Sequence, residues 1–267
     1  MVMNLKYMVT PQIKKCIVLF CCVLSVGQFT YAQNSENSQL TEDVVTVEES
    51  NELPAADPFS NFSATFSAYR YGRELGHANL ALTKLEGNQY RLDYSSSVSI
   101  FFLSDKRKET SIFTVQDNQI TPESYVFKRT GTGSDKHVRV LFDHDKAKIV
   151  VNDRPSFPLL QQLDNQLYRL DLQAKLAKGE TDFSYDVINY RGELKEYQLS
   201  VIATESLTLP FGKIDAIKVG FVRENSTRQT YAWFAPQLNY QLVRLQQFKD
   251  GEEQGDIQLS KYEADGS

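Results

Sequence analysis

The sequence of 267 residues contains only three cysteines, and all of them lie near its N-terminus. They are Cys16, Cys21 and Cys22, within an apolar run that ends at Val26. From residue 33 onward the chain has no thiol that could form a disulfide, ligate a metal or act as a nucleophile. These three kinds of cysteine chemistry are therefore excluded from that part of the chain.

The motifs of other enzyme classes are missing as well. His77, His137 and His144 do not have the spacing of a zinc-binding pair. The segment 131–134 lacks the Lys-Ser/Thr ending of a phosphate loop, and the Gly-x-Ser-x-Gly motif of serine hydrolases is absent. We interpret Asp-His-Asp at 143–145 as a polar turn rather than a metal site. We therefore expect a protein that is not an enzyme and has no cofactor or metal.

Positive charge is scarce in this sequence. It has 29 Lys and Arg against 34 Asp and Glu, a formal net charge of −5. The first 32 residues contain three lysines and no acid, so their removal takes the net charge from −5 to −8. A nucleic-acid-binding protein needs surplus cations to displace counterions from phosphates. We therefore expect no nucleic-acid partner.

A long apolar segment is also lacking, and this decides how the N-terminus is interpreted. The apolar run 16–26 is too short to cross a bilayer, which needs about 20 residues. It follows Lys6, Lys14 and Lys15, and it precedes Thr-Tyr-Ala at 30–32, with small residues at the two positions that signal peptidase recognises. We predict that residues 1–32 are a signal peptide cleaved near Ala32. The mature protein is then periplasmic and is not an integral membrane protein.

The next segment, 33–58, is rich in Asn, Ser, Glu and Thr. Such a composition cannot bury enough apolar surface to offset the entropy of ordering the chain. We predict a disordered acidic linker here, followed by one folded domain at 59–262 and a C-terminal tail at 263–267.

From Phe59 onward, apolar residues alternate with polar ones, as in strands that bury one face. The alternation is clearest at 62–68 and 90–100. Further strands are expected at 75–85, 108–116, 120–129, 136–142, 146–151, 181–189, 194–203, 213–223, 228–235, 239–248 and 255–262. Short sequential strands of this kind predict a mainly β protein with an antiparallel curved sheet, either an incomplete β-barrel or a sandwich.

One central helix is expected at 164–178, between the two groups of strands. Asp164 is suited to cap its N-terminus, and Leu163, Leu167 and Leu170 recur at helical spacing. This apolar stripe predicts that the helix packs on the sheet instead of facing water.

A series of motifs runs through the second half of the chain. They are Asp164 with Leu-Tyr-Arg-Leu at 167–170, Glu205, Pro-Phe-Gly at 210–212, Tyr-Ala-Trp-Phe-Ala-Pro at 231–236, Val243-Arg244 and Asp250-Gly251. Their order resembles the DUF3108 family of bacterial exported proteins, over residues 59–262. The chain departs from the family pattern at Gln241-Leu242, where a Pro is expected before Val-Arg. The resemblance implies a curved antiparallel β fold with a helix, similar to periplasmic half-barrels that hold lipids or lipoprotein segments, and it implies no catalytic residues.

Three residues near the C-terminus are candidates for ligand binding: Tyr231, Trp233 and Arg244. The strand at 228–235 carries rings on both faces, so two interpretations of Trp233 are open. Trp233 is either a core anchor, or it lines the concave face with Tyr231 and touches an apolar ligand. Arg244 is either solvated, which we favour, or paired with a carboxylate.

Three functions remain open at this point. The leading hypothesis is a non-enzymatic periplasmic protein that holds an apolar or amphiphilic envelope component, such as a lipid or a lipoprotein segment, in a concave sheet. The alternative is a structural or protein-interaction module of the envelope with a filled core, and the third is a polysaccharide hydrolase with two carboxylates. An apolar pocket on the order of several hundred Å³ would favour the first, and a filled core would favour the second.

Overall fold

The computed structural model describes residues 59–223 and 226–264, which form one sheet of 15 strands with one α-helix. The predicted signal peptide 1–32, the predicted linker 33–58 and residues 265–267 lie outside the described residues. The last strand extends through Ala264, two residues into the predicted tail.

Fifteen strands account for most of the described chain. Those before the helix are β1 (Phe62–Arg70), β2 (Arg73–Lys84), β3 (Gln89–Ile100), β4 (Leu103–Gln116), β5 (Gln119–Gly131), β6 (Lys136–Asp143), β7 (Lys148–Val151), β8 (Arg154–Pro158) and β9 (Leu163–Asp164). After α1 (Leu167–Ala177) come β10 (Asp182–Ile188), β11 (Leu194–Leu209), β12 (Gly212–Phe221), β13 (Arg228–Ala235), the short 3-10 helix η2 (Pro236–Leu238), β14 (Gln241–Lys249) and β15 (Glu252–Ala264).

The order of the strands in the sheet is β8 to β1, then β15 down to β9. The first and last strands of the sequence therefore pair with each other in the middle of the sheet, with Phe62 opposite Ala264. Neighbouring strands are antiparallel except β9 and β10, which are parallel. Because β8 and β9 are not paired with each other, the sheet is not closed by hydrogen bonds. The prediction of a mainly antiparallel, incomplete barrel is confirmed.

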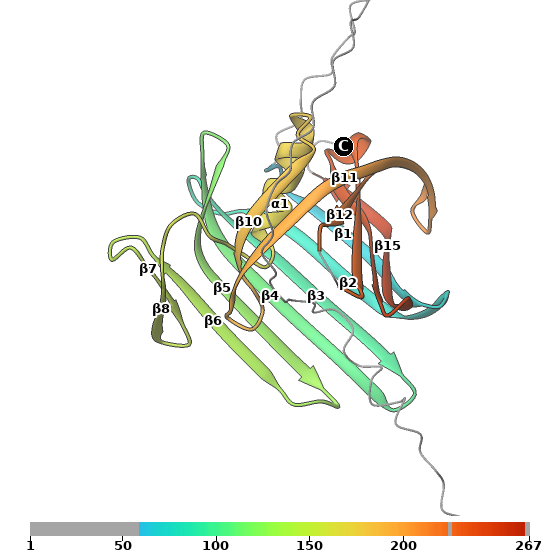
Figure 1. Cartoon of the computed structure of the whole chain (residues 1–267), viewed down its shortest axis with the longest axis horizontal. Helices are drawn as coiled ribbons and strands as arrows, with labels where there is room; N and C mark the ends of the chain where they lie inside the picture. Colours follow the sequence, from blue (N-terminus) through green and yellow to red (C-terminus); the bar gives the residue numbers. More distant parts are fainter. Residues whose placement is uncertain (1–58, 224–225, 265–267) are drawn as a thin grey trace, which may run out of the picture.

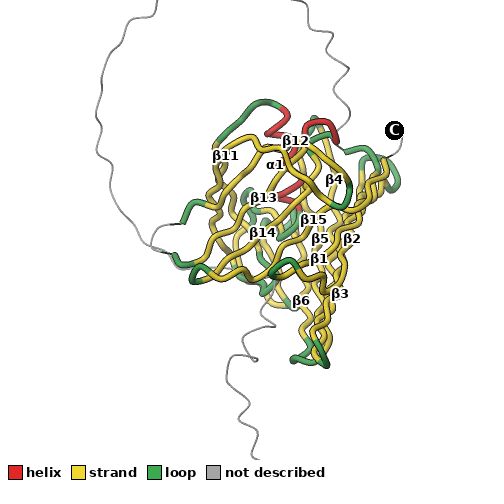
Figure 2. The backbone as a smooth tube through the Cα atoms, turned by 90° about the vertical axis from the view of Figure 1, so that its right-hand side faces the viewer, coloured by secondary structure: helices red, strands yellow, loops and turns green. Residues whose placement is uncertain are grey.

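The sheet curls strongly, so that its two halves face each other with α1 between them (Figures 1 and 2). The main core fills this curl with Leu167 and Leu170 of the helix and rings such as Phe113, and it continues under the β11–β12 hairpin with Leu207 and Trp233. A smaller core closes the gap between the two halves. In this second core Tyr125 and Phe127 of β5 belong to the same cluster as Ile188 and Tyr190, from β10 and its following turn.

The helix begins later than predicted. It runs from Leu167 to Ala177, because Leu163 and Asp164 instead form β9 and pair with β10. Asp164 still satisfies the first turn, since its Oδ1 accepts hydrogen bonds from the backbone N–H groups of Gln166 (2.8 Å) and Leu167 (3.0 Å). The expected packing of the helix is confirmed, because Leu167 is fully buried. None of the described helices is long and apolar enough to span a membrane.

The hairpin of β11 and β12 leaves the sheet at its far end and arches over its neighbours (Figure 1). Only Ile217–Gly220 of β12 pair with β13, whereas β12 pairs with β11 along its whole length. At the hairpin tip the backbone N–H of Phe211 donates to the carbonyl oxygen of Leu259 in β15 (3.0 Å). The hairpin therefore covers part of the outer face of β13–β15.

Candidate functional site

Two adjoining cavities lie inside the curl, where α1 meets the sheet. The larger one, about 50 Å³, is named here the polar chamber, and its wall includes Glu109, Asn165, Arg169, Tyr197, Arg223 and Gln247. The smaller one, about 30 Å³, is the apolar chamber, and its wall includes Phe62, Phe66, Leu80, Leu92, Leu242 and Ile257. Three residues line both of them: Tyr94, Arg169 and Leu245.

The chambers are small. Each has room for a few water molecules, whereas pockets for drug-sized ligands measure about 300–1,000 Å³. Tyr94 also lines a third space of about 10 Å³, so the interior holds a chain of small cavities around this ring instead of one large pocket.

Arg169 is the cation at the boundary between the chambers. Its Nη2 donates to the backbone oxygen of Asn165 (3.0 Å), and its guanidinium carbon lies 5.6 Å from the centre of the Tyr168 ring. Among the described residues, no carboxylate oxygen lies within 4.0 Å of its side-chain nitrogens. Burial acts to lower the pKa of Arg169, but the charges of Tyr168 and Glu109 outweigh it and raise the pKa. The side chain is therefore a charged guanidinium inside the protein.

Glu109 supplies the one carboxylate in the wall of the polar chamber. It is 5% exposed, and its Oε2 accepts hydrogen bonds from the hydroxyl of Tyr125 (2.7 Å) and from Nδ2 of Asn165 (2.9 Å). One donor lies on β5 and the other between β9 and α1, and together they fix the orientation of the Glu109 carboxylate.

A second arginine, Arg223 just after β12, also lines the polar chamber. Arg223 donates through Nη1 to Oγ1 of Thr230 (3.3 Å) and lies 4.7 Å from the centre of the Phe221 ring. The rings of Tyr197 and Phe221 meet edge to face at 5.4 Å. The wall of the polar chamber thus carries two guanidinium groups, one carboxylate and several aromatic rings, so its net charge is positive.

Guanidinium groups bind carboxylates and phosphates through paired hydrogen bonds, and aromatic walls exclude water from such contacts. The apolar chamber next to Arg169 can accept hydrocarbon. The pair of chambers is therefore suited to a small anion that carries an apolar part. Among the described residues no group of side chains has the arrangement of a metal site.

Asp164 is the other unusual carboxyl of the interior. It is 0% exposed, and burial raises its pKa to about 6, with the charge of Glu109 acting in the same direction. Asp164 caps the helix and lines neither chamber. The two carboxyl groups therefore do not share an open cleft of the kind that a glycoside hydrolase needs.

The three residues proposed from sequence lie elsewhere. Thr230 and Leu245 line the polar chamber, and side chains alternate along a strand, so Tyr231, Trp233 and Arg244 point to the opposite face. None of the three lines a chamber. Their assignment as ligand-binding residues stays a prediction.

Arg244 is paired, contrary to the solvated interpretation that we favoured. Its Nε and Nη2 donate to Oδ1 (2.9 Å) and Oδ2 (2.7 Å) of Asp256 on the neighbouring strand. Two parallel bonds of this kind form because β14 and β15 bring the fork of the guanidinium opposite the carboxylate.

Arg169, Glu109 and Arg223 were missed by sequence reasoning. Arg169 sits in a helix with mixed polarity, where a charged side chain is expected to face solvent. One signal was available in β4, where alternation places Asp105, Arg107 and Glu109 on the same face as the buried Phe113.

The structure defines a class of protein, an open barrel-like antiparallel sheet that curls around one helix. Residues 61–258 match the sequence model of DUF3108, described as a protein of unknown function, and the chain belongs to this family. No curated protein sequence matches the chain.

Two solved structures are similar to it. One is a β-barrel-like protein of the domain of unknown function DUF1849 from Brucella abortus, with a TM-score of 0.53 and 9% identity over 78% of this chain and 99% of that chain. The other is an exported-protein candidate with a YmcC-like fold from Bacteroides fragilis, with a TM-score of 0.29 and 13% identity over 76% and 96% of the two chains. The first similarity concerns the fold alone.

Proposed function

We propose that this protein is a non-enzymatic periplasmic binding protein for an anionic amphiphile of the cell envelope. The head group contacts Arg169 in the polar chamber, and the apolar part enters the apolar chamber. The observation that carries this proposal is the position of Arg169, which lines both chambers and has no ion-pair partner among the described residues. A lipid or an acylated lipoprotein segment has the required chemistry.

The physical reason is the desolvation of a cation. A guanidinium has five N–H donors, and within the part of the chain that the structure describes Arg169 donates one hydrogen bond. Arg169 is half-buried, and partial removal of a charge from water without a partner is costly, whereas a carboxylate or phosphate would satisfy two donors at once. The protein therefore gains by binding an anion at this point.

Chamber size limits what the closed structure can hold. The polar chamber has room for a head group, but the apolar chamber has room only for a short hydrocarbon segment. A longer chain would have to widen the apolar chamber. The small volumes also suit the alternative function, an interaction module with a filled core.

The proposal is non-enzymatic because the buried carboxyls of the described residues are engaged in structure: Asp105 and Asp256 are paired with arginines, and Glu109 and Asp164 accept hydrogen bonds. Glu109 accepts bonds from Tyr125 and Asn165, and Asp164 caps α1. A periplasmic location is supported by the signal-peptide pattern of residues 1–32. Intact mass of the exported protein checks it, with a mature N-terminus expected near Gln33.

Titration calorimetry with octanoate tests the binding proposal, with octanol as the uncharged probe of equal length. We expect octanoate to bind and octanol to bind at least tenfold more weakly, because a charge-assisted bond contributes about 1.5–3 kcal/mol. Arg169→Gln should remove this preference. The matched control is Arg91→Gln, since Arg91 is exposed on the sheet and paired with Asp93.

Two results would contradict the proposal. If the wild type binds neither probe, the filled-core alternative is favoured. If Arg169→Gln still folds and binds octanoate as the wild type does, the guanidinium is not the head-group site.

A further inference from the structure

The tip of the β3–β4 hairpin presents two phenylalanines to solvent. Phe101 is 86% exposed and Phe102 is 85% exposed, the highest values among the large apolar residues described as exposed. Figure 1 shows this hairpin and that of β5–β6 extending side by side beyond the curl of the sheet. Adjacent rings with this exposure are unfavourable in water and indicate a surface that is covered in use.

The two phenylalanines are unfavourable residues for the turn that they occupy. In the described chain, six two-residue turns join paired strands, and five contain Gly, Asn, Asp or Pro, the usual turn residues. Only Phe101-Phe102 has none of them. Phe101 also adopts φ +53°, a left-handed conformation that is strained for a bulky residue. Only the first residue of this turn has a positive φ, so a hairpin under no other demand would carry Gly at position 101.

The neighbouring hairpin adds a third ring and two cations. The guanidinium of Arg73 lies 5.9 Å from the centre of the Phe101 ring, so the β1–β2 and β3–β4 tips are in contact. Tyr71 is also exposed, with Arg70 5.3 Å from its ring centre. Aromatic and basic side chains thus meet at one end of the sheet.

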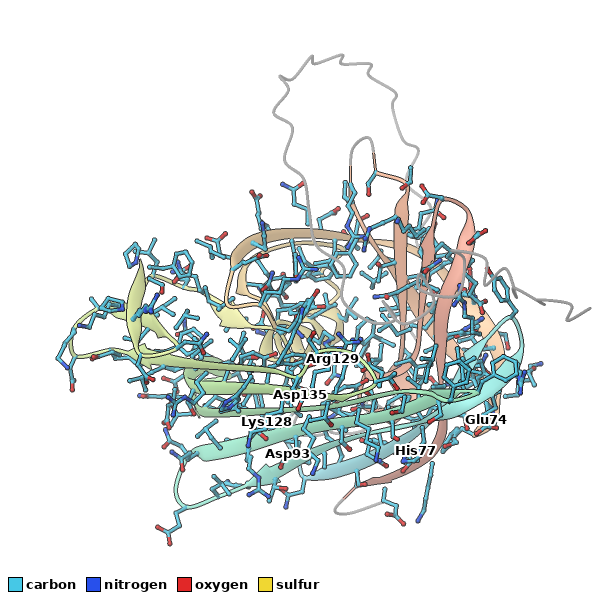
Figure 3. The ribbon with its side chains drawn as sticks, turned by 90° about the horizontal axis from the view of Figure 1, so that it is seen from below. Glu74, His77, Asp93, Lys128, Arg129 and Asp135 are labelled. Carbon is cyan, nitrogen blue, oxygen red and sulfur yellow. The ribbon has the colours of Figure 1, made fainter. Side chains whose placement is uncertain are left out.

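The strands behind these tips are basic in an otherwise acidic chain. Segments 95–108 and 126–139 contain seven Lys and Arg against two acids, although the net charge of the whole sequence is −5. Arg107 and Arg129 are paired with the buried Asp105, so the exposed cations are Lys106, Lys108, Lys128, Lys136 and Arg139. Lys108 lies directly opposite Lys128, and Lys128 lies opposite His137. Figure 3 labels Lys128 and Arg129 of β5, together with Asp135 of the β5–β6 tip. Like charges placed opposite each other on a sheet are destabilising, so an anionic partner would stabilise this face.

We propose that the hairpin tips form a membrane-docking surface for anionic phospholipid. Phe101 and Phe102 enter the interface between head groups and acyl chains, with Tyr71 at head-group level, and Lys106, Lys108 and Lys128 contact the anionic head groups. Aromatic rings favour this interface, and each nearby cation adds attraction to an anionic leaflet. A lipid surface is favoured over a protein partner because the rings lie on protruding tips, which can enter a bilayer interface without a matching pocket.

Vesicle flotation of the protein purified after export, with its N-terminus verified near Gln33, tests this proposal. The probes are vesicles of equal parts phosphatidylglycerol and phosphatidylcholine, and vesicles of phosphatidylcholine alone. We expect binding to the first at low salt and weaker binding both at high salt and to the second. The double variant Phe101→Gly with Phe102→Asn should weaken binding roughly tenfold or more, since it removes both rings from the tip.

This double variant places Gly at the turn position with positive φ, so it should fold at least as well as the wild type. Charge is tested by the triple variant Lys106→Gln, Lys108→Gln and Lys128→Gln, which should bind both vesicle types alike. The matched control is Leu160→Ser, which removes an exposed apolar side chain between β8 and β9 and should bind as the wild type.

The proposal is overturned if the wild type does not float with the anionic vesicles. It is also overturned if the double variant, shown to be folded, floats as well as the wild type. Octanoate binding at Arg169 is measured without vesicles, so either proposal can fail without the other.

Discussion

Trp233 is held by groups from three other strands. Its Nε1 donates to Oε2 of Glu205 on β11 (2.8 Å), and its ring lies between Lys218 of β12 (5.1 Å) and Arg244 of β14 (4.9 Å). It is 2% exposed, although it points away from the interior of the curl. The β11–β12 hairpin supplies this cover, so Trp233 joins two layers of the protein.

We expect Trp233→Ala to lower the free energy of unfolding by about 3–5 kcal/mol, because it leaves a large cavity under the hairpin. Trp233→Phe should cost less, since a ring remains between Lys218 and Arg244, although the bond to Glu205 and part of the buried volume are lost. Urea unfolding of both variants measures the difference. A loss below about 1 kcal/mol for the alanine variant would show that the ring is not an anchor.

Asp164 makes stability depend on pH in a defined direction. Burial raises its pKa to about 6 from an ordinary value of 3.8. Between pH 3.8 and about pH 6, Asp164 is protonated in the folded protein and ionised in the unfolded chain. The contribution of Asp164 to the free energy of unfolding is therefore fully present below pH 3.8, falls as the pH rises, and is lost above about pH 6.

We predict that Asp164→Asn stabilises the protein at pH 7 by on the order of 1–3 kcal/mol, because an amide oxygen can still cap α1 without a buried charge. The gain over the wild type should shrink toward pH 4. Thermal unfolding across this range measures it, with the exposed Asp215→Asn as the control. If Asp164→Asn unfolds more easily than the wild type at every pH, the carboxylate itself is needed.

At the scale of elements, α1 is the only described α-helix, and its apolar stripe is buried against the interior of the sheet. Leu167 is fully buried, and Leu170 forms part of the apolar chamber. The helix therefore supplies core contacts and also positions Arg169.

We expect Leu167→Ala to lower the free energy of unfolding by about 2–5 kcal/mol in a denaturant titration, because the site is a core position that cannot collapse freely. Lys178→Ala, at the exposed end of the helix, should change it by less than about 0.5 kcal/mol. A loss under about 1 kcal/mol at Leu167 would instead describe a helix that opens as a mobile lid.

Alternation predicted most strands because one face of each is buried and the other is wet. It missed β9, whose two residues are too few to show a period, and β8, where Pro155 and Pro158 argue against a strand. Prolines are tolerated in β8 because it is an edge of the sheet. Alternation left both interpretations of Trp233 open. The β11–β12 hairpin covers this side chain only in the folded protein, and no local sequence pattern predicts that cover.

At the scale of the whole molecule, the order of strands is a circular shift of the order in the sequence. The two ends of the domain meet in the sheet, whereas β8 and β9 at its two edges are joined by a short connection that includes the exposed Leu160. The pairing of β1 with β15 is therefore the pairing of greatest sequence separation, and closing so long a loop slows folding.

A circular permutant that begins at Gln161, ends at Leu160 and joins Ala264 to Phe59 by a short flexible linker should fold to the same sheet. We expect it to fold faster than the wild type, because β15 and β1 become a local hairpin. Stopped-flow refolding measures this rate, with a flexible insert between Asp117 and Asn118 as the control for added length. A permutant that folds more slowly would show that another contact limits the rate.

The junction of β1 and β15 also matters for a chain that becomes available from its N-terminus onward, as during synthesis. One edge of β1 pairs with β2, and this pairing can form early. The other edge pairs with β15, so it stays unpaired until residues 252–264 have been synthesised. Until then that edge exposes unpaired backbone groups to other chains, which makes the nascent domain prone to aggregation. Loss of the last 13 residues of the domain would therefore leave a permanent opening in the centre of the sheet, and not merely a shorter end.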